Sequence, residues 1–318
     1  MNRFTLLLIA MLGLAGASLF VGVSDVTPAT LLAGGPDGEA ARVMIISRLP
    51  RTAALVLAGS SMSIAGLLMQ MMIRNRFVEP STAGTVDAAS LGLLLVTFLA
   101  PGTPIMGKML VSAAFAGAGT VLFLRLLARA PLRDVVMVPL IGIMFGGVIG
   151  SITAFLAYRF ELLQMLAAWR TGDFSGVLLG RYELLWLGFG AAAIAWIAAD
   201  RFTVAGLGRD FATNLGLDYR RVLALGVSIV AIVTAVVVST VGMIPFLGLV
   251  VPNIVSLLIG DNMRRAVPWV ATLGAAFVLA CDIFGRVIRA PYEIPIGTVV
   301  GVVGGGLFLW LLLRKRHV

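Results

Sequence analysis

Long apolar stretches separated by short groups of charged residues dominate the sequence and limit what the chain can fold into. Hydrophobic residues make up 60% of the chain and charged residues only 12%, whereas a typical soluble domain is about 45–50% apolar. So little polar surface cannot cover so much apolar material in water. Lipid is therefore the expected solvent for most of the chain.

Ten of these stretches are candidate transmembrane helices, and no linker, low-complexity tract or internal repeat separates them into parts. The sequence therefore predicts an all-α integral membrane protein with about ten transmembrane helices and a single transmembrane domain covering residues 1–318. The starts of 85–100 and 244–260 contain glycine, proline and polar residues, so these two are the least regular. The ten predicted spans are 4–23, 52–73, 85–100, 109–128, 135–157, 183–199, 222–240, 244–260, 267–285 and 296–313.

The first apolar stretch could be a cleaved signal peptide, because Arg3 precedes it and Ala15, Gly16 and Ala17 resemble a cleavage site. The uncharged run is about 20 residues, which is long for a signal sequence and sufficient for a span. A retained helix is favoured. An even number of spans then puts both termini on one side, and the basic tail 314–316 predicts that this side is the cytoplasm.

The basic residues recur in short groups instead of forming one face, so the net charge of +9 does not indicate nucleic-acid binding. In the ten-span arrangement 15 of the 24 basic residues fall on the cytoplasmic side and 9 on the outer side. This bias has the direction of the positive-inside rule. The basic residues on the outer side call for a separate explanation.

Motifs for catalysis, nucleotide binding and metal binding are missing from the sequence. The one histidine, His317, lies in the tail, and the one cysteine, Cys281, cannot form an internal disulfide. The segment 102–109 approaches the P-loop pattern but has Met109 where a hydroxyl side chain is needed for Mg²⁺. We therefore predict a protein that is not an enzyme and that binds no metal or cofactor itself.

Few ionisable residues lie inside the predicted spans. Asp282 is the clearest, and Arg286 follows four residues later, so the spacing favours a structural helix pair over a proton relay. Asp87 is interpreted as a charge at a helix N-terminus. Because a secondary transporter often carries paired intramembrane charges, their scarcity favours energy input from a partner protein, with an ion-coupled carrier as the alternative.

Three stretches carry a family resemblance. They are RLPRTAALVLAGSSMSIAGLLMQ with RNRFVEPSTAG (48–70 and 74–84), VGMIPFLGLVVPNIVSLLIGDNMRR (241–265), and DIFGRVIRAPYEIPIGTVVGVVGGGLFLWLLLRK (282–315). Together they resemble the FecCD-type permeases of ABC importers for iron–siderophore complexes, haem and cobalamin. The form VPNIVSLLIGDN looks most similar to permeases for ferric siderophores of the catecholate or mixed-ligand type. A cobalamin or haem importer is the nearest alternative.

The resemblance implies the rest of an importer in the bacterial plasma (inner) membrane. Its parts are a second permease subunit, a pair of cytoplasmic ABC ATPases that use ATP and Mg²⁺, and a periplasmic or lipid-anchored siderophore-binding protein. A heterodimer of permeases is favoured over a homodimer. Cargo would cross by alternating access, driven by the partner ATPases.

The polar stretch GLGRDFATNLGLDYRR (206–221) interrupts the apolar pattern between two predicted spans. From the residues alone, a solvated loop with a basic anchor explains this stretch as well as a functional contact does. The resemblance implies short coupling helices that contact the ATPase, and the predicted contact residues are Arg209, Phe211, Ala212, Thr213, Leu215 and Gly216.

The resemblance also assigns roles on both sides of the membrane. Arg48, Arg51 and Arg286 match arginines that dock acidic residues of the binding protein, a role that suits the planar guanidinium. Anchoring to lipid headgroups is the alternative. Asn75 and Phe77 match a loop that narrows the cytoplasmic end of the pathway, although Arg76 and Phe77 depart from the family pattern.

Overall fold

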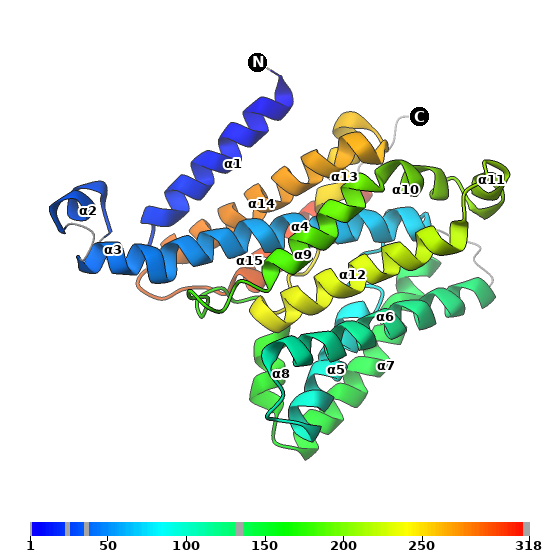
Figure 1. The fold of residues 1–318 in the computed structure, drawn as a ribbon, viewed down its shortest axis with the longest axis horizontal. Coiled ribbons are helices and arrows are strands. Elements are labelled where there is room, and N and C mark those ends of the chain that lie inside the picture. The colour runs from blue at the N-terminus through cyan, green and yellow to red at the C-terminus, as the bar shows by residue number, and fades with distance from the viewer. Residues whose placement is uncertain (1, 23–25, 35–37, 131–135, 314–318) are drawn as a thin grey trace.

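The computed structural model describes residues 2–22, 26–34, 38–130 and 136–313, and all regular structure in these ranges is helical (Figure 1). The basic tail and His317 lie outside them. The helices are α1 (Arg3–Phe20), α2 (Pro28–Gly34), α3 (Glu39–Val43), η1 (Met44–Arg48), α4 (Leu49–Ile73), α5 (Thr85–Leu99), α6 (Ile105–Arg129), α7 (Met137–Arg159), α8 (Leu163–Arg170), α9 (Leu185–Ile197), α10 (Ala199–Ala205), α11 (Arg209–Asn214), α12 (Tyr219–Val241), α13 (Leu247–Ile259), α14 (Met263–Val287) and α15 (Ile296–Leu313).

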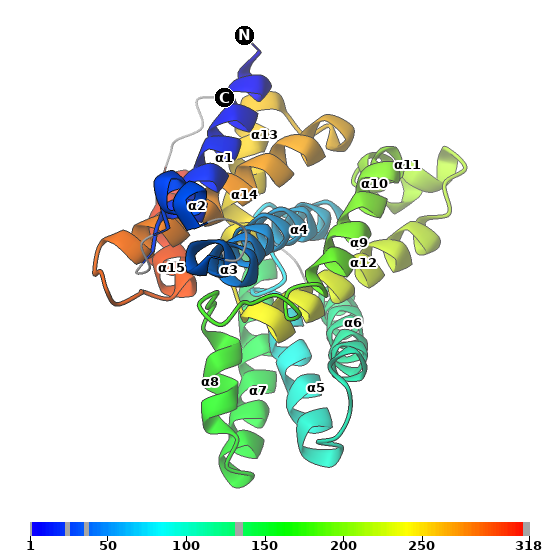
Figure 2. The same cartoon turned by 60° about the vertical axis from the view of Figure 1, so that its left-hand side comes forward.

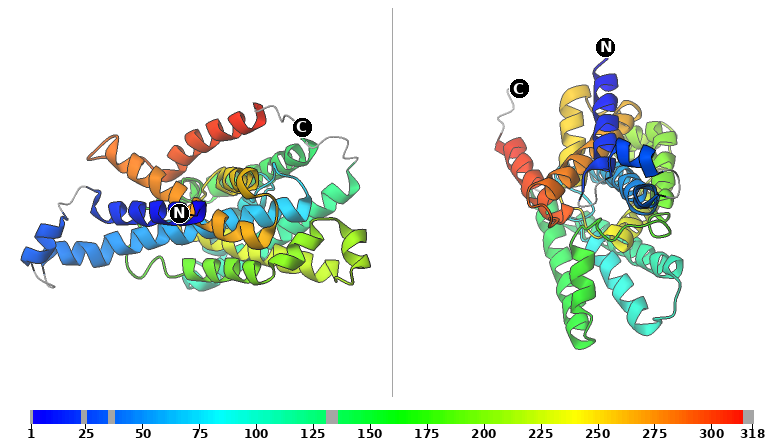
Figure 3. Two further views of the ribbon diagram at one scale, coloured as in Figure 1. Left: turned by 90° about the horizontal axis from the view of Figure 1, so that it is seen from above. Right: turned by 90° about the vertical axis from the view of Figure 1, so that its left-hand side faces the viewer.

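Helix α4 runs through the middle of the molecule (Figures 1 and 2). It packs against α13 and α14 on one side and against α9 and α12 on the other. Nearly all its side chains are buried, because it is apolar or small around its whole circumference. Helices α5 to α8 form a second group that projects away from this centre, joined to it mainly through the α6–α12 contact (Figures 2 and 3).

Glycine allows the helix backbones around α4 to touch directly. A Cβ atom at Gly66 would lie 2.0 Å from the carbonyl oxygen of Gly248 in α13, and one at Gly274 in α14 would lie 2.5 Å from the carbonyl oxygen of Gly59. Both distances are too short for any side chain. Close backbone approach at small residues is the usual way in which helices associate in lipid.

The repeated G-x-x-x-G of α7 works in the same way. A Cβ atom at Gly142 would lie 2.1 Å from the carbonyl oxygen of Thr82, and one at Gly146 would lie 2.8 Å from a carboxylate oxygen of Asp87. These glycines therefore pack α7 against the start of α5 and the loop before it, as their spacing indicates.

Six helices in the described ranges are long and apolar enough to cross a membrane, and the bent pair α9–α10, with 67° between its parts, could supply a seventh. The remaining apolar helices, α5, α13 and α15, are shorter. The all-helical membrane fold is thus confirmed. By length and composition the structure supports six to seven spans, and ten stays a prediction.

The short helices have a structural cause, because the chain turns back on itself inside the molecule. The loop after α4 returns far enough for Glu79 to contact Phe246 at the start of α13. Gly248 in the first turn of α13 touches Gly66, which lies seven residues, or about 10 Å, before the end of α4 at Ile73. Helix α13 therefore starts within the helix bundle. Such irregular backbone is tolerated in a membrane only where protein surrounds it.

The molecule has two ends, which we call the α3 end and the α11 end (Figure 3). Helix α4 starts at the α3 end and finishes at the α11 end. Helix α1 starts beside α14, where Phe4 contacts Trp269 with ring centroids 5.5 Å apart, and runs toward the α3 end (Figure 1). Helix α15 runs toward the α11 end, and its Phe308 contacts Phe77 in the loop after α4. The start of α1 and the end of α15 are therefore both directed away from the α3 end.

Candidate functional site

The polar stretch between α9 and α12 folds into a projecting turn of short helices, which we call the knuckle (residues 199–218; Figure 1). Helix α10 leads into the six-residue α11, which begins after Gly208 at φ 114°. The side chain of Asp218 accepts a hydrogen bond from the backbone N–H of Arg221 (3.1 Å) and so caps the start of α12. The predicted short helix is present, and both its ends are fixed by specific residues.

The exit from α11 is a tight helix-ending motif. The backbone N–H of Leu217 donates to the carbonyl of Ala212 (3.0 Å), and that of Gly216 donates to the carbonyl of Thr213 (2.9 Å). Gly216 has φ 78°, the left-handed conformation that this Schellman motif requires. Thr213 also closes the helix, because its hydroxyl donates to the carbonyl of Arg209 (2.8 Å).

The knuckle exposes apolar side chains. Phe211 is 52% exposed and Leu215 is 62% exposed, and their spacing of four residues puts them on one side of the turn. Ala212 is fully buried, so it packs the helix onto the protein and does not belong to the exposed surface. Exposed apolar side chains on an ordered projection are typical of a protein contact surface.

The predicted gate residues lie in the loop after α4, also at the α11 end. Asn75 is 4% exposed, and its side-chain oxygen accepts from the backbone N–H of Phe77 (2.8 Å). The ring of Phe77 packs edge-on against Phe308 of α15, which stacks on Phe246. The structure thus brings together the loop, the start of α13 and α15 in one aromatic cluster.

Asn253 of α13 holds this loop in place. Its side-chain amide donates to the carbonyl of Arg76 (2.7 Å) and to that of Leu249 (2.8 Å). Arg76 forms an ion pair with Asp261, which follows α13. A cleft of about 480 Å³ lies between this loop, α10 and the end of α13. The gate loop is therefore tied to the helix that carries the VPNIVSLLIGDN sequence.

Sequence reasoning missed Glu79, a buried carboxylate in the same loop. It is fully buried, and its Oε1 accepts from the backbone N–H of Phe246 (2.9 Å) at the start of α13, and also from Ser81. Within the described residues its Oε2 has no hydrogen-bond partner.

The predicted docking arginines lie in an ion cluster at the α3 end. Arg51 contacts Asp282 (2.7 Å) and Glu293 (2.8 Å), and Asp282 also pairs with Arg286. The side chains of Asp282 and Arg286 are 0% and 1% exposed. The i,i+4 pair predicted from the sequence is confirmed, and Arg51 joins it from a helix 231 positions away. We call Arg48, Arg51, Asp282, Arg286 and Glu293 the ion cluster.

The ion cluster also holds the end of α1. Arg286 donates to the hydroxyl of Ser18 (2.7 Å) and to the carbonyl of Val21 (2.6 Å). Arg48 donates to the same carbonyl of Val21. Arg48, Arg51 and Arg286 are all under 10% exposed, so the structure brings the three predicted docking residues together but beneath the surface.

Asp87 lies in the first turn of α5, as expected of an N-terminal charge. Its carboxylate is 3.7 Å from the guanidinium of Arg170 at the end of α8. The near P-loop at 102–109 forms the turn into α6, and Lys108 lies within that helix. In the described part of the chain no group of three or more His, Cys, Asp or Glu residues could hold a metal ion.

Comparisons with known proteins agree with this arrangement. Residues 6–314 match the FecCD transport family. The chain is 48% identical over 310 residues to the petrobactin import system permease protein YclN of Bacillus subtilis (strain 168), covering 98% of each. It is 41% identical over 313 residues to the petrobactin import system permease protein FatD of Bacillus anthracis, covering 98% of this chain and 91% of that protein.

A solved structure shares the fold along its whole length. It is an inward-facing conformation of a metal-chelate type ABC transporter, with a TM-score of 0.82 and 23% identity, and the match covers 98% of this chain and 99% of the other. At this identity the match concerns the fold alone. It includes the bent and short helices that length and composition do not identify as spans.

Proposed function

The chain belongs to the FecCD transport family of multi-pass membrane proteins, and we propose that it is the permease subunit that carries a ferric siderophore inward in an ATP-driven importer. As a transport component it is not an enzyme. The cargo class is inferred from the 48% identity, over 98% of both chains, to a petrobactin permease. A petrobactin-type ferric siderophore is therefore the first cargo to test.

The full arrangement is ten membrane crossings with both termini in the cytoplasm. The six long helices, the bent pair and the three short apolar helices supply these crossings. The short helices suffice because buried loops such as 74–84 complete their path. The start of α1 and the end of α15 are both directed away from the α3 end, which supports a common side for the termini.

The knuckle is the contact with the cytoplasmic ATPases. Phe211 and Leu215 enter an apolar cleft of the ATPase, and Arg209 lies exposed at the start of the same helix. Ala212 and Thr213 keep α11 helical, and Gly216 fixes its exit. ATP-driven movement of the partner then moves α12, to which the knuckle is directly joined.

Cargo passes the gate loop when α13 and α15 separate from it. Phe77 blocks the cytoplasmic end through its contact with Phe308, and Asn75 and Asn253 hold the loop in the closed position. The heterodimeric partner is a second permease of the same family. This chain needs no cofactor, because ATP and Mg²⁺ are used by the ATPases.

The siderophore-binding protein docks at the α3 end through Arg48, Arg51 and Arg286. Because these arginines are already paired with Asp282 and Glu293, acidic residues of the binding protein have to replace those partners. Replacing Arg48 and Arg51 by glutamate is expected to weaken docking at least tenfold. Arg289→Glu, an exposed position at the same end, is the control, and an equal loss there would show that docking follows overall charge.

The function is tested by uptake of radiolabelled iron. A deletion strain, the complemented strain and the parent are compared under iron limitation with petrobactin, a hydroxamate and citrate as chelators. The deletion strain is expected to lose uptake of iron bound to petrobactin and to keep uptake with the other two chelators. Unchanged uptake with every chelator, together with lost uptake of labelled cobalamin or haem, would assign the chain to the other cargo class of its family.

A further inference from the structure

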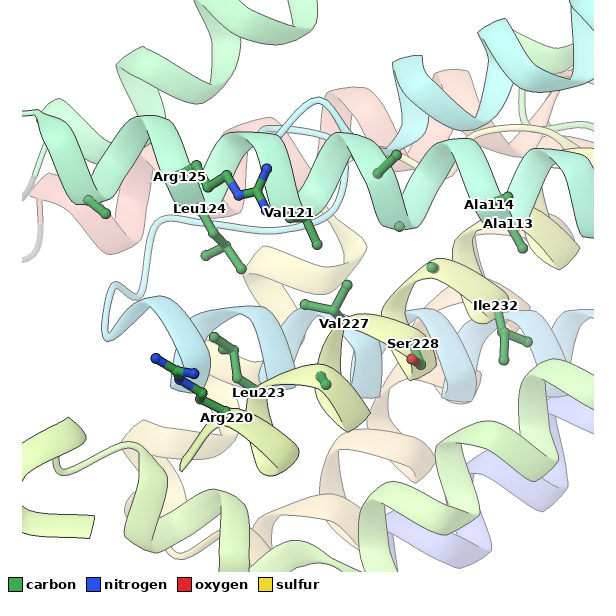
Figure 4. Close-up of a pocket in the computed structure, with 15 residues that line it drawn as sticks. Ala113, Ala114, Val121, Leu124, Arg125, Arg220, Leu223, Val227, Ser228 and Ile232 are labelled. Atoms are coloured by element: carbon green, nitrogen blue, oxygen red, sulfur yellow. The ribbon is translucent and has the colours of Figure 1, made fainter. Parts of the chain in front are cut away.

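A groove of about 930 Å³ lies between α6 and α12 (Figure 4), and none of its lining residues belongs to the ion cluster or the gate loop. Small residues form it, because the two helices touch at Gly117 and Ala231 and their neighbouring side chains are too short to fill the space. The lining positions recur every three or four residues on both helices and are Ala113, Ala114, Gly117, Ala118, Val121, Leu124, Arg125, Ala128, Arg220, Leu223, Ala224, Val227, Ser228, Ala231 and Ile232.

The groove is charged at one end only. Figure 4 shows Arg125 and Arg220 at the same end of the groove but on opposite helices, with Ala113, Ala114 and Ile232 at the other end. Arg125 comes from the last turns of α6 and Arg220 from the first turn of α12, so both lie toward the α11 end. Both side chains are exposed. Neither has an ion-pair partner among the described residues, whereas the adjacent Arg221 pairs with Asp218 at 2.8 Å.

The length of the groove fits one leaflet of a bilayer. From Arg125 to Ala113 on α6, and from Arg220 to Ile232 on α12, the distance is twelve residues, or about 18 Å at 1.5 Å per residue. Half of a hydrocarbon core is about 15 Å. The arginines therefore come at headgroup depth when the apolar part of the groove lies among acyl chains.

We infer that this groove is a binding site for an anionic phospholipid of the cytoplasmic leaflet, with its phosphate between Arg125 and Arg220 and an acyl chain along α6 and α12. Guanidinium groups hold phosphate oxygens through paired charge-assisted hydrogen bonds. Basic pockets between helices on the cytoplasmic side are suited to acidic headgroups. The inference depends on the membrane arrangement of the chain and is independent of its cargo.

The charges decide between this lipid and a neighbouring protein helix. A helix seated in the groove would need acidic residues opposite both arginines to provide complementary charge. A zwitterionic lipid would bring a positive group to the same place. An anionic lipid supplies the missing charge and the apolar chain in one molecule.

The test is lipid retention by the purified, assembled importer, measured by native mass spectrometry during titration with phosphatidylglycerol or phosphatidylcholine of identical chains. The intact protein is expected to prefer phosphatidylglycerol. Arg125→Gln with Arg220→Gln is expected to lower its affinity roughly tenfold or more. The control, Arg129→Gln with Arg221→Gln, removes the same charge from the same helix ends outside the groove and is expected to leave the preference intact.

A second pair of variants tests the apolar part. Ala118→Leu with Ala224→Leu fills the groove and keeps both arginines, so it is expected to weaken retention of phosphatidylglycerol. An equal loss of phosphatidylglycerol retention in the Arg125/Arg220 and Arg129/Arg221 double variants would overturn the proposed site. If glycerol 3-phosphate at the same concentration competes with the lipid, the groove is a phosphate site. If the isolated chain retains lipid but the importer assembled with the second permease does not, the groove is a subunit interface. Both results contradict the proposal.

Discussion

The two ends of the molecule differ in where their charged and apolar side chains lie. At the α3 end, five charged side chains gather and pair with one another or with the end of α1, and all but the partly exposed Glu293 lie beneath the surface. At the α11 end, charges such as Asp200 and Arg264 stay exposed, with side chains 63% and 65% exposed respectively, and apolar side chains of the knuckle project outward. One end is held together by internal charge pairs, and the other leaves charged and apolar side chains exposed.

This difference has a physical basis. A buried ion cluster is costly to assemble and costly to disrupt, since removal of one member leaves another charge unpaired in a low-dielectric interior. An exposed ion pair contributes little, because water screens it. Exposed apolar residues likewise contribute little to folding but can dominate an interface. The same kind of substitution should therefore affect stability at one end and association at the other.

The largest effect is expected from Asp282→Asn. It leaves Arg286 and part of Arg51 without a carboxylate in the protein interior, at a cost of about 3–5 kcal/mol. Thermal unfolding of the detergent-solubilised protein measures this loss. The matched control is Asp200→Asn, which breaks an exposed Asp–Arg pair at the other end and should cost less than about 1 kcal/mol. Equal losses at both positions would abolish the distinction between the ends.

The next effect concerns the knuckle. Leu215→Asp puts a charge where an apolar contact is proposed, so affinity for the ATPase is expected to fall at least tenfold. The melting temperature of the isolated permease should not change, because Leu215 is 62% exposed. The control Asn214→Asp adds the same charge at the adjacent exposed position. Normal affinity in the Leu215 variant would remove the knuckle from the interface.

The smallest effect is expected from Asn253→Ala. It removes two hydrogen bonds that fix the gate loop and α13 to each other, and each such bond contributes about 1 kcal/mol. The melting temperature should fall by a few degrees and uptake should continue. A fall as large as that of Asp282→Asn would show that the loop, and not the ion cluster, limits stability.

The sequence predicts the long helices well because their apolar periodicity is continuous. The span predicted at 222–240 corresponds to α12, and that at 52–73 corresponds to α4. The bend after Ile197 and the short α8 were not predicted, since both follow from packing between helices and leave no periodic signal. The position at which α13 starts has the same cause, because it depends on the contact between Gly66 and Gly248.

The candidate sites also contain some contacts that the sequence predicts and others that it does not. Contacts over four residues, such as Asp282–Arg286, can be predicted from spacing. The contact of Arg51 with Asp282 cannot, because it joins distant helices, and this contact makes the predicted docking arginines internal. In the sequence, Glu79 lies among turn residues, so the pattern around it indicates a polar loop. Its burial becomes visible only once Phe246, 167 positions later, is placed beside it.

The tight exit from α11 has a mechanical consequence. Only residues 215–217 and the capping Asp218 separate α11 from α12, and the Schellman motif holds this link in one tight conformation. Helix α12 is 23 residues, or about 34 Å, long. At its far end the carbonyl of Val241 accepts from the backbone N–H of Asp173 (2.8 Å), and the N–H of Met243 donates to the carbonyl of Trp169 (3.0 Å). The knuckle, α12 and α8 thus form a stiff lever, and a displacement applied on one side of the membrane arrives on the other within a single rigid element.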